Sequence, residues 1–254
     1  MADVRERLLR ACPDDYVRVE TEDHDVADVV VRDGAVGWTT RRWSHDLDWT
    51  TVLGTDCAEV AEVARTLVAL SAERDRPTGG LTVSRAAAAH VSRVLPWEPS
   101  GEWEWWLTRS APAYQPHEGL VVELSAQDPR LAELIATWSP LASVSAGDAV
   151  VRSWVGIVAQ DRLLGCGADT RRHLQVPHLA GVVTEGAHRG RGYAAAVCAK
   201  LTRDALAEGA PLVTLSMYSD NEAARRTYTR LGFRPQHAFS SGRLAATATR
   251  GTPG

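Results

Sequence analysis

A short segment in the second half of the chain has the composition of a phosphate-binding loop. It consists of Arg189, Gly190, Arg191, Gly192, Tyr193 and Ala194. It joins an apolar run typical of a buried strand, residues 178–184, to a helix predicted over 193–208. Glycine permits the tight turn and leaves the backbone amides uncovered. Amides that converge at a helix N-terminus bind phosphate oxygens, helped by the helix dipole. The segment therefore predicts a phosphate site, to which the two arginines add positive charge.

The same segment matches part of the GxGxxG fingerprint of dinucleotide-binding proteins. Three features count against that interpretation. Ala195 stands where the third glycine belongs, the loop follows two hairpin strands, and no acidic ribose-binding residue follows at the required distance. A nicotinamide-dependent oxidoreductase is therefore the weakest of the functions considered.

A second group of residues shares one face of a predicted helix about thirty positions further on. Asn221, Ala224 and Tyr228 recur at helical spacing, and Gly232 ends the helix. Tyr228 has two interpretations. It is either a core aromatic residue with a bonded hydroxyl, which the helix taken alone favours, or a phenol that donates a proton in catalysis.

The elements around these residues predict a mixed α/β fold. In the second half, the expected elements are a helix over 131–138, a hairpin of strands 153–159 and 162–168, a strand over 178–184, a helix over 193–208, a strand over 212–218 and a helix over 221–231. In the first half, they are a hairpin over 29–39, a strand over 49–53, a helix over 58–73, a strand over 81–83 and a helix over 85–94. The shared order favours a degenerate internal duplication, with coincidence as the alternative.

The predicted organisation has two domains. Residues 1–110 form the first domain, 111–119 a linker rich in proline, 120–244 the second domain and 245–254 a flexible tail. The net charge of −4 argues against broad nucleic-acid binding. No apolar run is long enough to span a membrane, and no cysteine pair has metal-binding spacing. We therefore expect a cytoplasmic protein with free thiols and no metal site.

Taken together, the two motifs resemble those of the GCN5-related N-acetyltransferase (GNAT) superfamily. The pyrophosphate-loop signature of that superfamily, Arg/Gln-x-x-Gly-x-Gly/Ala, is met by Arg189, Gly192 and Ala194. A later pattern of the superfamily is met by Asn221, Ala224, Tyr228, Gly232 and Phe233. The resemblance covers residues 120–244, about half of the chain. It implies a GNAT fold, with acetyl-CoA or another short acyl-CoA held between the strands at 179–184 and 212–218.

The resemblance also implies roles for individual residues. The backbone of Val182 and Val183, with Thr184 beside them, would meet the pantetheine arm, and Asn221 would help to hold it. Tyr228 would protonate the leaving thiolate. The general base would be a carboxylate near the end of the central strand. Glu185 follows that strand directly and is the candidate, with a solvated loop carboxylate as the alternative interpretation of the same residue. The acceptor would be the primary amine of a small molecule, a peptide N-terminus or a lysine. A homodimer is left open.

The first half lacks these features. Its corresponding loop contains Asp56 and no glycine pair. When the two halves are aligned, Ser92 occupies the position of Tyr228, so we expect a non-catalytic, degenerate GNAT-like domain. Two functions from different classes then remain. The first is direct acyl transfer from CoA to an amine. The alternative is a CoA-binding module without catalysis that regulates or binds something else.

Overall fold

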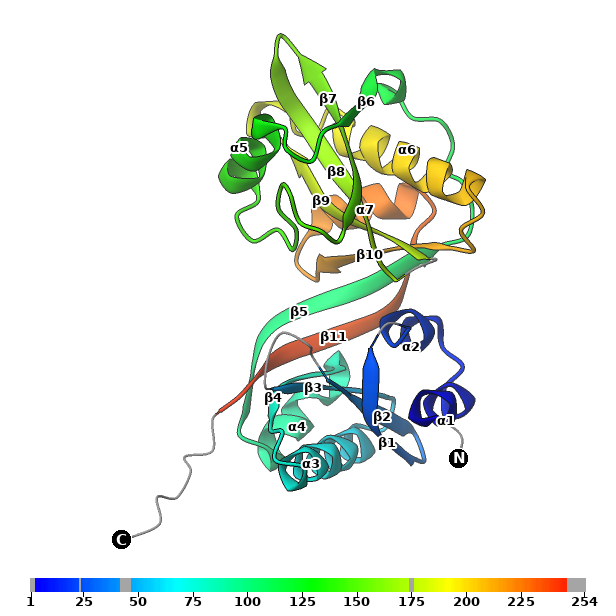
Figure 1. Ribbon diagram of the computed structural model, residues 1–254, viewed down its shortest axis with the longest axis vertical. Coiled ribbons are helices and arrows are strands. Elements are labelled where there is room, and N and C mark those ends of the chain that lie inside the picture. The colour runs from blue at the N-terminus through cyan, green and yellow to red at the C-terminus, as the bar shows by residue number, and fades with distance from the viewer. Residues whose placement is uncertain (1–2, 23, 42–46, 174–175, 246–254) are drawn as a thin grey trace, which may run out of the picture. The chain divides into compact units, whose positions relative to one another are not determined.

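The computed structural model describes residues 3–22, 24–41, 47–173 and 176–245 (Figure 1). The chain divides into two compact units. Unit 1 comprises Met1–Glu104 and His237–Gly254, and unit 2 comprises Trp105–Gln236. Strands β5 (Trp97–Thr108) and β11 (Arg234–Leu244) each contribute one end to each unit. The predicted functional domains, 1–110 and 120–244, stay predictions. All of the predicted tail except Ala245 lies outside the described residues.

Unit 2 is built on a mixed sheet, as predicted. Its strands lie in the order β5-β10-β9-β8-β7-β6. Strands β9 and β10 are parallel, whereas the pairs β6/β7, β7/β8 and β8/β9 are antiparallel. The remaining elements of the unit are η2 (Glu118–Leu120), β6 (Val121–Leu124), α5 (Pro129–Trp138), β7 (Val151–Ala159), β8 (Arg162–His173), β9 (Val176–Thr184), η3 (Gly186–His188), α6 (Tyr193–Ala207), β10 (Val213–Tyr218) and α7 (Glu222–Arg230). The predicted hairpin turn is present, because Gln160 and Asp161 both have positive φ angles.

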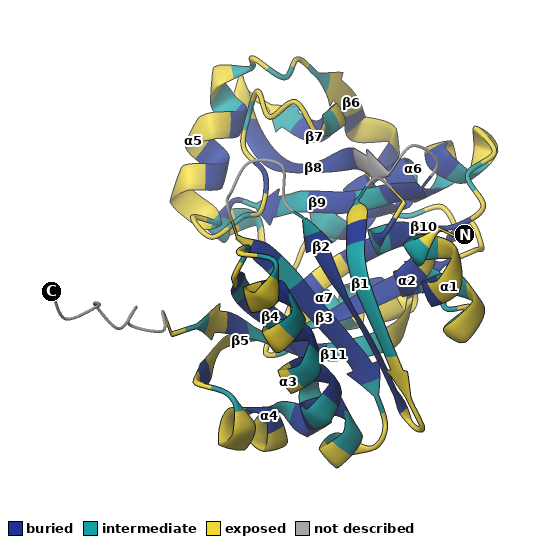
Figure 2. Cartoon of the chain, turned by 60° about the horizontal axis from the view of Figure 1, so that its bottom comes forward, coloured by how far each residue is buried: buried dark blue, intermediate teal, exposed yellow. Residues whose placement is uncertain are grey.

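Helices cover both faces of this sheet. Successive residues of β9 point to opposite faces. Leu179 packs in a core with α6 and Tyr228, whereas Ala180 packs in a second core with α5. The strands between these helices are largely buried, and the outer sides of the helices are exposed (Figure 2). The sheet thus separates α5 on one face from α6 and α7 on the other.

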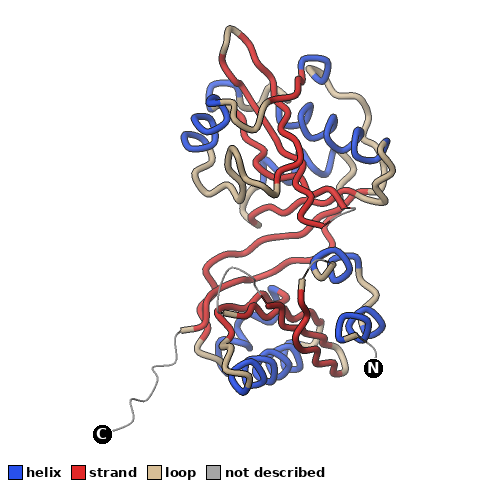
Figure 3. Tube along the Cα trace, in the orientation of Figure 1, coloured by secondary structure: helices blue, strands red, loops and turns tan. Residues whose placement is uncertain are grey.

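Unit 1 repeats the order of elements. Its sheet runs β1-β2-β3-β4-β11-β5, with β3 and β4 parallel and β11 antiparallel to β4. Figure 3 distinguishes the strands from the helices by colour. The elements are α1 (Val4–Ala11), α2 (Asp15–Glu20), β1 (Asp25–Arg32), β2 (Ala35–Arg41), β3 (Asp48–Gly54), α3 (Cys57–Glu73), β4 (Thr78–Ser84), η1 (Arg85–Ala87) and α4 (Ala88–Val94). The series β2-β3-α3-β4-α4-β5 corresponds to β8-β9-α6-β10-α7-β11. The same strand senses recur in both units, which supports the proposed duplication.

Three tryptophans of β5 pack inside the two units. Trp97 is a core residue of unit 1, where it packs with α3 and α4 residues. Trp103 lies 4.5 Å from the Phe239 ring, also in unit 1, and Trp106 belongs to the α6-side core of unit 2. None of the three is among the residues that line the pocket described below.

None of the described helices combines the length and the apolar character needed to cross a membrane. Within the same described residues, no group of three or more His, Cys, Asp or Glu side chains is placed to hold a metal ion.

Candidate active site

The parallel strands of unit 2 separate soon after they begin. Strands β9 and β10 pair only at His178 with Thr214 and at Leu179 with Leu215. Beyond these positions the described strands form no further ladder pair with each other. In unit 1, by contrast, β3 and β4 pair at five positions up to Val52 and Val83. Only unit 2 therefore has an opening between its parallel strands.

A bulge in β9 lies beside this opening. The pairing of β8 with β9 shifts between Ala180 and Val183, and Gly181 has a φ of +57°. A Cβ atom at Gly181 would lie 2.8 Å from the Trp154 ring, so glycine suits both the backbone and the packing. Because the extra residue interrupts the ladder, the backbone around Val182 is not matched to β8 and borders the opening.

The Gly-rich loop leads directly into α6. Gly190 and Gly192 have φ angles of +77° and +87°, and Gly192 is the N-cap of the helix. No side chain caps this helix, so its first amides are left for another acceptor. A Cβ atom at either glycine would meet nothing within 4 Å. In unit 1 the corresponding helix α3 is capped by Asp56, whose carboxylate accepts from the amides of Ala58 and Glu59.

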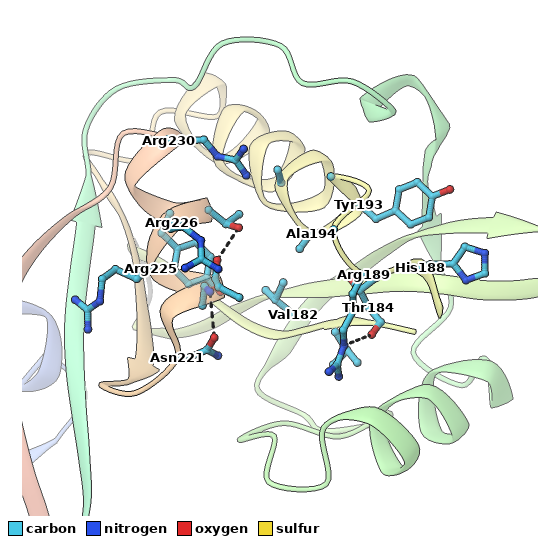
Figure 4. A pocket seen from close by; sticks show the side chains of 18 of the residues that line it. Val182, Thr184, His188, Arg189, Tyr193, Ala194, Asn221, Arg225, Arg226 and Arg230 are labelled. Carbon is cyan, nitrogen blue, oxygen red and sulfur yellow. Dashed lines mark hydrogen bonds between the residues drawn. The ribbon is translucent and has the colours of Figure 1, made fainter. Parts of the chain in front are cut away.

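These features enclose a pocket of about 830 Å³ (Figure 4). The loop and the start of α6 form one wall, α7 forms the facing wall, and Val182 lies between them. The predicted site residues that line it are Val182, Val183, Thr184, Arg189, Gly190, Gly192, Tyr193, Ala194, Asn221 and Tyr228. Arg191, which is exposed, and Glu185 are not among the lining residues.

The model of the acetyltransferase (GNAT) family matches residues 103–233, slightly more than half of the chain. The chain belongs to the GNAT family. No curated protein sequence matches it.

Solved GNAT structures share the fold. A GCN5-related N-acetyltransferase from Kribbella flavida is 19% identical, with 96% of each chain covered and a TM-score of 0.53. A GNAT acetyltransferase from Colwellia psychrerythraea is 15% identical over 91% of this chain and 88% of its own, with a TM-score of 0.53. A putative GNAT acetyltransferase from Novosphingobium aromaticivorans is 22% identical over 59% of this chain and 67% of its own, with a TM-score of 0.51.

Tyr228 is held in the core of this GNAT unit while it lines the pocket. Its residue is 7% exposed, and its ring lies 6.0 Å from that of Phe233. Burial raises the pKa of the Tyr228 phenol far above its usual value near 10, and the neighbouring Cys198 raises it further. The phenol is therefore neutral at physiological pH.

Asn221 has a structural role in addition to its predicted one. Its side-chain oxygen Oδ1 accepts from the amide of Ala224 at 3.0 Å, so it is the N-cap of α7.

Glu185 does not line the pocket, and its carboxylate contacts two other side chains. One carboxylate oxygen pairs with the guanidinium of Arg162, and the other lies 3.0 Å from Nδ1 of His188. His188 itself lines the pocket. These contacts favour a positioning role for the Glu185 side chain, so the assignment of Glu185 as the general base stays a prediction.

Several lining residues were not predicted from the sequence. Trp138, at the end of α5, accepts from Arg189 Nη2 through its carbonyl oxygen at 3.3 Å, and the Arg189 guanidinium lies 5.5 Å from the Trp138 ring centre. Arg225, Arg226 and Arg230 of α7 also line the pocket. The sequence did contain a signal for Arg226 and Arg230, because residues four positions apart lie on the same side of a helix.

Proposed function

We propose that unit 2 binds acetyl-CoA, or another short acyl-CoA, in this pocket and transfers the acyl group to a primary amine. The observation that carries the proposal is the open Gly192 N-terminus of α6 beside separated parallel strands. Unit 1 has an Asp56 cap and paired strands at the corresponding place. We therefore propose that unit 1 is a degenerate, non-catalytic GNAT-like domain.

The residues present suit such a ligand. The uncapped amides after Gly192 would donate hydrogen bonds to the pyrophosphate oxygens, and the glycines leave space for them because a Cβ atom there would meet nothing within 4 Å. The backbone of Val182 and Val183 borders the opening, where it would orient the pantetheine amides. Arg189 is held by the carbonyl of Thr184 at 3.3 Å and thereby fixes the loop.

The proposed transfer is direct. The amine nitrogen attacks the thioester carbonyl carbon, the C–N bond forms and the C–S bond breaks. The departing thiolate takes a proton from Tyr228, whose phenol is neutral. The proton lost by the amine goes to the general base, for which we propose Glu185, the carboxylate directly after the central strand. Because Glu185 is not in the lining, that proton would reach it through a carrier such as His188.

The acceptor belongs to the class of primary amines, either a small molecule or a peptide amine. The alternative function is a CoA-binding module without turnover. The two functions differ in one result. An acyltransferase releases free thiol from acetyl-CoA only when an amine acceptor is present, whereas a binding module releases none with any amine.

The test is an amine screen on the full-length protein. We expect release of CoA thiol that depends on an amine and saturates with acetyl-CoA, together with an acylated product whose mass is increased by one acetyl group. Reactions without amine or without protein set the background. Saturable acetyl-CoA binding with no acylated product from small amines, lysine or peptide N-termini would contradict turnover and favour the binding module.

A further inference from the structure

The pocket lining carries arginines but no carboxylate. The chain as a whole has a net charge of −4, yet Arg189, Arg225, Arg226 and Arg230 line the pocket, with no Asp or Glu among the lining residues. The pocket lining is therefore positively charged, although the chain as a whole carries a negative net charge. A concave site of one charge sign raises the local concentration of oppositely charged ligands, so the lining suits a polyanion.

Two of these arginines are already held by protein groups. Arg189 donates to the carbonyl oxygens of Thr184 and Trp138. Arg225 donates to the carbonyl oxygen of Ser219 at 2.8 Å and to Glu222 at 3.2 Å. Their guanidinium groups stabilise the loop and the start of α7, respectively.

The other two arginines have uncommitted donors. Arg226 and Arg230 lie one helical turn apart on α7, and both are exposed. In the part of the chain that the structure describes, neither guanidinium makes a hydrogen bond or an ion pair. Each offers five N–H donors in a planar fork that matches phosphate oxygens. Figure 4 shows both on α7, across the pocket from Ala194 and the Gly-rich loop.

We propose that Arg226 and Arg230 bind the 3′-phosphate of CoA. This inference rests on the proposed function. CoA has two separate phosphate groups, the diphosphate and the 3′-monoester, and the pocket has two separate walls that suit phosphate. The uncapped α6 N-terminus takes the diphosphate, which leaves the arginine pair of α7 for the monoester. A phosphate monoester carries nearly two negative charges at neutral pH, so it pairs with two guanidinium groups.

The consequence concerns the acyl donor. An enzyme that binds the 3′-phosphate favours acyl-CoA over acyl donors that lack this phosphate. Thioesters of phosphopantetheine lack that group, as does 3′-dephospho-CoA. Contacts to the pantetheine arm alone would admit all of these thioesters, whereas contacts to the 3′-phosphate restrict the donor to acyl-CoA.

The experiment compares two ligands that differ only in this phosphate. Dissociation constants for acetyl-CoA and for acetyl-3′-dephospho-CoA are measured by calorimetry on the full chain. The proteins are the wild type, the double variant Arg226→Gln/Arg230→Gln and the control Arg234→Gln. Arg234 donates to the carbonyl oxygens of Thr229 and Phe233 and does not line the pocket. It therefore controls for the loss of positive charge near α7.

We expect the wild type to bind acetyl-CoA about tenfold more tightly than the dephospho ligand. The double variant should lose that preference by weakening acetyl-CoA binding about tenfold, with the dephospho ligand nearly unaffected. Arg234→Gln should retain the preference. Equal wild-type affinity for both ligands, or equal weakening of both in the double variant, would overturn this inference alone. Absence of wild-type binding to either ligand would overturn the proposed function with it.

Discussion

Replacement of Gly192 by Asp is expected to weaken acetyl-CoA binding by at least about a hundredfold, equivalent to about 2.7 kcal/mol. The new carboxylate would occupy the open N-terminus of α6, where the amides have no side-chain cap, and would repel a diphosphate. Asp56 already provides this arrangement at α3 in unit 1. Because Asp is a favourable N-cap residue and tolerates a left-handed backbone better than most side chains, the fold should be retained.

The matched control is Gly209→Asp. Gly209 follows the other end of α6, has a φ of +95°, and a Cβ atom there also meets nothing within 4 Å. It therefore carries the same backbone strain and the same charge change at a distance from the pocket. Both variants should show similar thermal unfolding, with only Gly192→Asp losing the calorimetric binding signal. Normal affinity in a folded Gly192→Asp protein would refute the assignment of the phosphate loop.

Replacement of Tyr228 by Phe is expected to lower kcat by about 10² to 10³, with little change in acetyl-CoA affinity. The substitution removes only the hydroxyl, and the ring can keep its contact with Phe233 and its place in the core. In the proposed transfer this hydroxyl donates its proton to the departing thiolate, so its loss should slow the chemical step and leave binding intact. Steady-state rates with a saturating amine, together with a binding titration, separate the two effects.

Tyr193→Phe is the control for Tyr228→Phe. Tyr193 lines the same pocket, and its ring stacks with that of His188 at 6.1 Å between centres. Loss of the Tyr193 hydroxyl should leave kcat within a factor of about two, because no proton transfer is assigned to it. An unchanged rate in Tyr228→Phe would remove Tyr228 from the acid role. Equal losses in both variants would point to a general disturbance of the pocket.

Local signals were sufficient to predict much of unit 2. The glycines that turn the loop, the positive-φ pair at Gln160 and Asp161 and the Asn221 cap all depend on neighbours within a few residues. The sequence placed Glu185 at the end of the central strand, but its partner Arg162 lies 23 residues away. Such a pair is set by the register of β8 against β9, which no local pattern specifies.

Unit 1 was predicted less completely. Helices α1 and α2 have only eight and six residues, too few to show the extended apolar period that marks a helix. Strand β5 begins at Trp97, although Pro99 and Gly101 near its start are residues that disfavour a strand, so the local pattern does not indicate where it begins. The division of β5 and β11 between the two units depends on long-range pairing, which residue spacing does not reveal.

In the proposed function, unit 2 holds acyl-CoA through the uncapped N-terminus of α6. The most direct measurement is a calorimetric titration of the full-length protein with acetyl-CoA, with NADH and ATP as control ligands. We expect one saturable site for acetyl-CoA, weak or no binding of the controls, and loss of the site in Gly192→Asp. Absence of saturable acetyl-CoA binding by the folded wild-type protein would contradict the claim and leave the pocket without its proposed ligand.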